Sequence, residues 1–184
     1  MTDVLVLVDH TDGELKNTTA ELLTAARAFG TPAAVVVGKP GTADSFAETL
    51  NKYGAGEILA AESDEAGKYL ITPEVDVLVG LAAERQVPVL VSASATGKEI
   101  AGRVAALTGS GLLSDVIDIA DDRTATYSIF GGEYIAEGQG FGASPVYSVR
   151  PGAVDPAENA GSASVSAIEY PAAGEGAVEI VSFT

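Results

Sequence analysis

The sequence predicts an α/β domain in which a mostly parallel sheet is flanked by helices, with antiparallel strands in the carboxy-terminal third. Short apolar runs alternate with segments of helical periodicity up to residue 120, the rhythm of strand–helix–strand units. Beyond that point, short apolar runs follow one another between Asp-Asp and Gly-Gly turn signals. We expect a single domain, residues 1–184, with a parallel core at 1–120 and antiparallel strands and an acidic terminal segment at 121–184.

The first repeat begins with residues 4–8, a continuous apolar run that is typical of a strand buried on both faces. The dipeptide Asp12-Gly13 then predicts a turn. Thr18 and Glu21 have the spacing of a capping box, in which each side chain accepts from the other residue's backbone N–H. Gly30 predicts the end of the helix that follows.

The second repeat has the same order of signals. Residues 33–37 predict a strand, and a capping box of Ser45 and Glu48 predicts a helix that ends at Gly54. Residues 57–61 predict the third strand, which is shorter.

Two more helices complete the parallel core. Thr72 followed by Pro73 is typical of a helix start, because proline is tolerated in the first turn. Residues 87–91 predict the fourth strand, and Thr96 with Glu99 forms a third capping box. The residues expected on the inner faces of the four helices are Leu22, Ala26 and Phe29, then Phe46, Leu50 and Tyr53, then Val75, Leu78, Val79 and Ala82, and finally Ile100, Val104 and Leu107.

The last third of the chain changes character. Residues 113–119 predict one further buried strand, and residues 124–130, 135–137 and 146–149 predict short antiparallel strands. Two more short strands are expected at 165–169 and 178–183, with the chain packed up to Phe183.

Charge and composition exclude several classes of partner. The chain carries 26 acidic and 10 basic residues, a net charge of −16. Such a surface repels phosphate backbones and anionic lipids, so no nucleic acid and no membrane partner is expected. No cysteine is present, which excludes disulfides and thiolate metal sites. The apolar run at 4–8 has no basic segment before it and is too short for a signal peptide or a membrane span, which predicts a cytoplasmic protein.

Residues for hydrolytic or metal catalysis are missing. The only histidine is His10, just past the first strand, where a loop residue is expected rather than a base. No Gly-x-Ser-x-Gly motif occurs, which makes an α/β hydrolase the least supported class. One histidine without cysteine does not make a zinc site. We therefore predict no catalytic residue and no metal site.

The turn between the fourth strand and the fourth helix is a candidate anion site. Ser94, Thr96, Gly97 and Lys98 lie where free N–H groups and the helix dipole favour a phosphate. In the competing interpretation, Glu99 pairs with Thr96 and its carboxylate occupies the positive end of the helix. The internal cap is the expected state, and the anion site is kept as the alternative.

Four blocks of the sequence resemble the α subunit of electron transfer flavoprotein. They are the turn and helix at 92–107 with the Leu-Ser-Asp-Val strand after it, the segment 12–17 leading into 22–27, Lys-Tyr-Gly-Ala at 52–55, and Ser-Val-Arg-Pro at 148–151. The blocks occur in the family's order, and the resemblance covers residues 4–183.

The resemblance implies a function for the full protein. Members of the family pair with a β subunit, carry FAD, and pass electrons from flavin dehydrogenases such as acyl-CoA dehydrogenases to a quinone reductase of the respiratory chain. Their flavin domain opens on a Ser-Gly-Gly-Arg-Gly turn, which does not occur here, so no FAD-binding residue is expected in this chain. We expect an amino-terminal scaffold and subunit-interface domain of an electron carrier.

Tyr134, Ile135 and Phe141 are the expected interface residues. They lie in residues 130–141, where short antiparallel strands have no helices to cover both faces. Self-association of the chain is expected when its partner is absent. The alternative function is a stand-alone adenine-nucleotide-binding module resembling universal stress proteins. Such a module needs a glycine-rich phosphate turn after the fourth strand, where this sequence has a Ser/Thr-rich one.

Overall fold

A computed structural model describes residues 3–174 and 176–182 of the chain. Within them, the main strands are β1 Val4–Leu7, β4 Pro32–Gly38, β5 Glu57–Glu62, β6 Val89–Ser92, β7 Leu112–Val116, β11 Val146–Val149 and β12 Val165–Ile168. They form one sheet in the order β12-β5-β4-β1-β6-β11-β7, in which every pairing is parallel. The predicted α/β fold with a mostly parallel sheet is confirmed.

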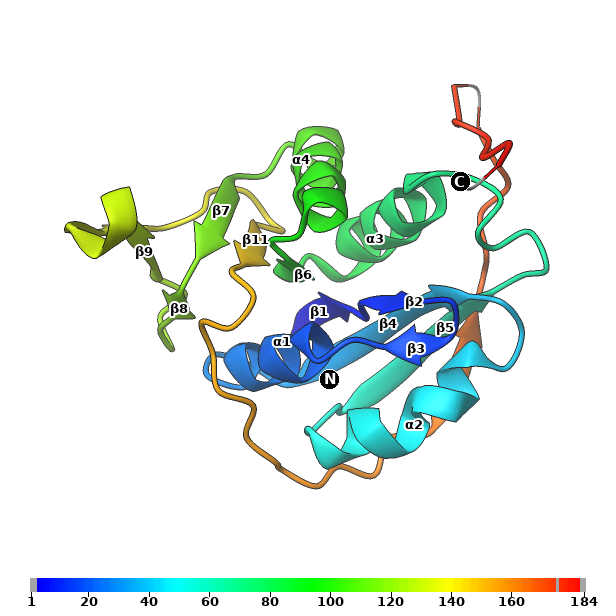
Figure 1. The fold of residues 1–184 in the computed structure, drawn as a ribbon, viewed down its shortest axis with the longest axis horizontal. Helices are drawn as coiled ribbons and strands as arrows, with labels where there is room; N and C mark the ends of the chain where they lie inside the picture. The colour runs from blue at the N-terminus through cyan, green and yellow to red at the C-terminus, as the bar shows by residue number, and fades with distance from the viewer. Residues whose placement is uncertain (1–2, 175, 183–184) are drawn as a thin grey trace.

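Helices cover both faces of this sheet (Figure 1). The helices α1 Thr18–Ala26 and α2 Thr42–Lys52 pack on one face, while α3 Thr72–Arg85 and α4 Ala95–Thr108 pack on the other. Because β1, β4 and β6 lie between the two helical layers, all their residues are buried. The core therefore consists of two apolar clusters, one on each side of the sheet.

One residue predicted to face inwards does not. Leu107 is 63% exposed, whereas the other predicted inner-face residues are buried or packed against a core cluster. The buried stripe of α4 runs through Gly97, Ile100, Ala101, Val104 and Ala105. Leu107 lies at the edge of that stripe, since successive helical residues are rotated by about 100°.

A second, antiparallel sheet projects from the body of the molecule (Figure 1). Its order is β10-β9-β8. The elements are β8 Asp118–Ile119, β9 Ala125–Ile129 and β10 Tyr134–Gly138, with the 3₁₀ turn η1 Phe130–Gly132 between the last two. The antiparallel pairing predicted for 124–130 and 135–137 is thus confirmed.

The antiparallel prediction is wrong for the two strands that follow. β11 enters the main sheet between β6 and β7, and β12 adds to the outer edge of β5, both in parallel. Short apolar runs carry no signal of strand direction. The direction is decided by the connections, and both of these strands return to the main sheet through long irregular segments.

The segment between β11 and β12 runs beneath α1 and α2 and is tied to them (Figure 1). The Glu21 carboxylate accepts from the N–H of Gly152 at 2.7 Å, and Arg27 donates to the carbonyl of Ala157. Asn51 forms two bonds with the backbone of Ala163, accepting at 2.6 Å and donating at 2.9 Å. These contacts hold the connecting segment against α1 and α2 and position β12 beside β5.

The first two predicted capping boxes are wrong. α1 begins after Asn17, and Thr18 instead donates to the carboxylate of Asp9 at 2.9 Å. α2 begins after Gly41, three residues before Ser45 could act as a cap. The carboxylate of Glu62, at the end of β5, accepts from the N–H of Gly41 at 2.9 Å and of Ala43 at 2.7 Å. A remote carboxylate therefore replaces the local cap.

The predicted strand at 178–183 is not formed in the described residues. Glu179 makes one isolated bridge with Tyr69, and Val181 is 96% exposed. The segment is still held against the loop before α3, because Val178 accepts from the N–H of Leu70 and Ile180 donates to the carbonyl of Lys68, both at 2.9 Å. Phe183 lies outside the described residues.

Candidate functional site

The candidate site lies at the carboxyl ends of β1, β4 and β6. The sheet order reverses here, because the chain lays β4 and β5 on one side of β1 and then places β6 on the other. Such a reversal leaves a crevice at the carboxyl edge of an α/β sheet. In this protein the crevice holds a hollow of about 100 Å³ with an apolar floor of Leu7, Val37, Val91 and Ile100.

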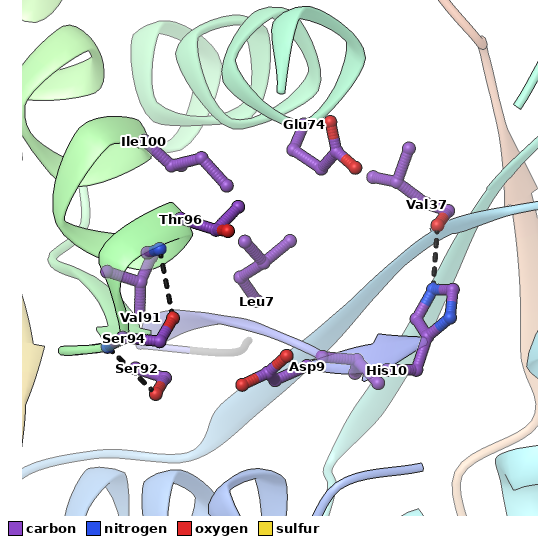
Figure 2. Close-up of a pocket in the computed structure, with 12 residues that line it drawn as sticks. Leu7, Asp9, His10, Val37, Glu74, Val91, Ser92, Ser94, Thr96 and Ile100 are labelled. Atoms are coloured by element: carbon purple, nitrogen blue, oxygen red, sulfur yellow. Dashed lines mark hydrogen bonds between the residues drawn. The ribbon is translucent and has the colours of Figure 1, made fainter. Parts of the chain in front are cut away.

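Three of the four predicted anion-site residues meet at this hollow. Ser94, Thr96 and Gly97 line it at the start of α4, and Ser94 Oγ accepts from the N–H of Gly97 at 3.1 Å (Figure 2). The fourth, Lys98, does not line it, because its Nζ lies 3.5 Å from Asp115. The four predicted residues therefore do not meet at one place, and the N–H groups of Ser94, Gly97 and Lys98 are already bonded within the turn.

The third predicted capping box is also wrong. Ser94 is the N-cap of α4, so the helix starts two residues before Thr96 could cap it. Glu99 accepts instead from Arg103 at 3.0 Å, one turn further along the helix. The internal cap exists, but Ser94 forms it in place of Thr96.

Among the described residues, the charged side chains that line the hollow are carboxylates, with no lysine or arginine. Asp9 follows β1 and lies 3.0 Å from Lys16. Glu74, in the first turn of α3, lies across from it (Figure 2). Burial raises the pKa of Glu74, and the bond from its own backbone N–H opposes that rise. This distribution of charge disfavours a phosphate.

His10 is held in one orientation. It begins β2 His10–Thr11, which pairs with β3 Glu14–Leu15 around the predicted turn at Asp12-Gly13. Its Nε2 lies 2.9 Å from the carbonyl of Val37, and its ring lies 5.3 Å from that of Phe46. A carbonyl only accepts, so Nε2 donates and, in the neutral ring, Nδ1 is an acceptor. The predicted loop residue is therefore a fixed part of the hollow wall.

A wider cleft of about 660 Å³ shares His10, Val37 and Glu74 with the first hollow. Its far wall includes Lys39 and Tyr170. Tyr170 lies two residues after the end of β12. Burial raises the pKa of the Tyr170 hydroxyl, and the charge of Glu74 raises it further. Sequence reasoning missed both Glu74 and Tyr170. An acidic residue after Thr72-Pro73 was a weak local signal for Glu74, whereas Tyr170 follows a strand whose direction was mispredicted.

A cluster of charges lies at the carboxyl ends of β7 and β11. Asp115 accepts from Arg150 at 2.8 Å and lies near Lys98. The bond from Arg150 holds the pKa of Asp115 below its ordinary value, and Lys98 contributes in the same direction, while burial opposes them. Arg150 also donates to the carbonyl of Ser128, which connects the main sheet to β9.

The projecting sheet and the segment after it expose large apolar side chains, as predicted. Tyr134 and Ile135 in β10 are 56% and 63% exposed, and Phe130 in η1 is 79% exposed with its ring in edge contact with Tyr134. Phe141 is 71% exposed and lies three residues after β10, where its carbonyl accepts from the N–H of Gly111 at 2.8 Å. Exposed apolar groups of this size are unusual on a protein that has no partner. Their role as an interface remains a prediction.

The described residues contain neither a cluster of metal ligands nor a membrane-spanning helix. No group of three or more metal-ligating side chains gathers in residues 3–174 and 176–182. In the same residues, no helix combines the length and the apolar composition needed to cross a bilayer.

The comparisons with known proteins agree on one family. The family model described as "Electron transfer flavoprotein domain" matches residues 4–174. The electron transfer flavoprotein subunit alpha of Mycobacterium tuberculosis (strain CDC 1551 / Oshkosh) is 54% identical over 96% of this chain and 56% of its own length. The subunits alpha of Mycobacterium leprae (54% identical, 98% and 57%) and Paracoccus denitrificans (32% identical, 89% and 53%) are also similar.

The chain thus spans little more than half the length of these relatives. The match of the family model to residues 4–174 and the identity of 54% over nearly the whole chain show that the chain belongs to the electron transfer flavoprotein family.

Proposed function

We propose that this chain is the amino-terminal domain of an electron transfer flavoprotein α subunit and acts as scaffold and subunit interface. The observation that carries the proposal is the family match over residues 4–174 together with the exposed apolar side chains of the projecting sheet. In this proposal the chain is an electron-carrier component rather than an enzyme, and the cytoplasm is its compartment.

The full protein would bind FAD mainly through a part that this chain does not include. It would shuttle electrons from acyl-CoA dehydrogenases and other flavin dehydrogenases to the respiratory chain, which connects it to fatty acid β-oxidation. The missing Ser-Gly-Gly-Arg-Gly turn supports the assignment of FAD to another part. The adenine-nucleotide module is not favoured, because the family match accounts for nearly the whole chain and the predicted phosphate turn is incomplete.

The β subunit of the same protein is the proposed partner, and Tyr134, Ile135 and Phe141 are the proposed contact residues. Hydrophobic side chains at the centre of an interface contribute most of its binding free energy. With the partner absent, the same side chains support self-association of the chain, which sedimentation over a hundredfold concentration range would detect.

A pull-down and calorimetric titration with the cognate β subunit tests this interface. We expect Tyr134→Ser and Phe141→Ser each to weaken binding at least tenfold, because each removes a large exposed apolar group. Leu70→Ser is the matched control, since Leu70 is 51% exposed but lies just before α3, away from the projecting sheet. Unchanged binding by both interface variants would remove the projecting sheet from the contact surface.

A further inference from the structure

Three unpaired buried polar groups converge on the cleft at the carboxyl edge of the sheet. In the part of the chain that the structure describes, four buried side-chain nitrogen or oxygen atoms have no hydrogen-bond partner. Three of the four are His10 Nδ1, Glu74 Oε2 and Tyr170 Oη, and all three residues line the wider cleft. Buried polar groups in folded proteins are nearly always bonded, so their clustering around one cleft points to a ligand.

The chemistry of these groups limits what the ligand can be. The bond from His10 Nε2 to Val37 makes Nδ1 an acceptor in the neutral ring. The Glu74 carboxylate is a second acceptor, and it lies on the opposite side of the hollow from His10 (Figure 2). His10 and Glu74 line the same cleft, and two acceptors there are best matched by a molecule with at least two N–H donors.

The residues that line the two hollows limit the rest of the ligand. The smaller hollow, which shares Val37 with the wider cleft, adds an apolar floor of Leu7, Val91 and Ile100 that suits a flat hydrocarbon or ring body reaching in from the cleft. At the two hollows the carboxylates of Asp9, Asp12 and Glu74 outnumber Lys39, the lysine that lines the wider cleft, so the balance of charge disfavours carboxylates and phosphates. The wider cleft, at about 660 Å³, has the size of an ordinary small-molecule site.

We propose that this cleft binds a small organic molecule that carries an amine, amidine or amide group on a flat apolar body. Its N–H groups donate to His10 Nδ1 and to the Glu74 carboxylate, and the Tyr170 hydroxyl bonds the ligand from the side of β12. Such a site goes beyond the proposed scaffold role and does not depend on it, because the cleft lies within one chain and away from the projecting sheet.

Two probes of the same size and opposite chemistry test the site on the 184-residue chain. Benzamidine offers N–H donors and positive charge, whereas benzoate offers acceptors and negative charge. In amide-resolved NMR, benzamidine should cause saturable shifts confined to residues around the cleft, with a dissociation constant on the order of 1 mM for so small a molecule. Benzoate should cause none.

Three variants connect the response to the named groups. Glu74→Gln should weaken benzamidine binding at least tenfold, because an amide cannot offer two acceptor oxygens. Tyr170→Phe should weaken it several-fold and provides a second reading if Glu74→Gln does not fold. Glu84→Gln, an exposed carboxylate on the same helix that lines neither hollow, should leave it unchanged. Equal response to both probes, no saturable shift, or full binding by folded Glu74→Gln and Tyr170→Phe would overturn the proposal.

Discussion

Two glycines of α4 should respond to the same substitution in opposite directions. Alanine in a helix interior is normally more stable than glycine by about 1 kcal/mol. At Gly102 an added Cβ meets nothing within 4 Å, so Gly102→Ala should increase the free energy of unfolding by about that amount. At Gly97 the same Cβ would lie 1.9 Å from the carbonyl oxygen of Ser92.

The clash at Gly97 cannot be relieved by a side-chain rotation, because the opposing atom belongs to the backbone of β6. The start of α4 must move away from the sheet, and overpacking of this kind costs about 1–3 kcal/mol or more. The movement also disturbs the bond from the Gly97 N–H to Ser94, a cap worth about 1 kcal/mol. Because a separation of 1.9 Å is severe, the overpacking cost falls in the upper part of this range. With the loss of the cap added and the helix gain subtracted, we expect Gly97→Ala to destabilise the chain by about 2–3 kcal/mol.

Urea unfolding and thermal scanning measure both effects. For a chain of this size, about 1 kcal/mol corresponds to 2–4 °C, so Gly102→Ala should raise Tm by roughly 2–4 °C and Gly97→Ala should lower it by about 4–12 °C. The urea m-value should stay constant if both variants remain two-state. The reasoning fails if Gly97→Ala is as stable as the parent chain, since the helix would then not be in contact with Ser92.

Further predictions concern caps, ties and charges. Ser94→Ala should cost about 1 kcal/mol of stability and Thr96→Ala close to none, because only Ser94 caps α4; urea unfolding of the pair decides it. Asn51→Ala should cost about 2 kcal/mol, since two backbone bonds to the β12 connection are lost, and hydrogen exchange should rise first in β12. Arg150 stabilises the fold through the ionised carboxylate of Asp115, so its effect should be fully present above 3.8, the ordinary pKa of that group. The effect should disappear as the pH falls through the lowered pKa of Asp115 in the folded chain. The Tm difference between the parent chain and Arg150→Gln should therefore shrink in acid. Addition of the chain should leave the fluorescence of FAD unquenched. AMP or ATP should not raise Tm; a nucleotide that did bind, at 100 times its Kd, would raise the free energy of unfolding by about 2.7 kcal/mol, which is easily detected.

Local sequence patterns predicted much of the secondary structure and the family of this protein. Apolar runs bounded by polar residues located β1, β4, β5 and β6, because a strand covered on both faces must be apolar throughout. Glycine and proline signals located the turns and helices to within a few residues. The motif blocks identified the family, and the short runs after residue 120 predicted an exposed apolar segment at Tyr134, Ile135 and Phe141.

The helix caps show where local reasoning stops. All three capping boxes had the correct spacing, yet none forms. The N-cap of α1 is Asn17, without a side-chain cap bond, while α2 is capped by Glu62 from another strand and α4 by Ser94. A spacing rule considers only residues within one turn. Once the sheet brings a remote carboxylate next to a helix start, that carboxylate competes with the local one.

The sequence by itself determined the class of fold, the positions of its repeats and the family, since periodicity, composition and motif order are properties of neighbouring residues. Only the tertiary structure decided that β11 and β12 run parallel in the main sheet, that Lys98 turns away to Asp115, and that His10, Glu74 and Tyr170 line one cleft. Each of these facts depends on which distant segments meet. That is set by the connections and by packing over the whole chain, which no local pattern contains.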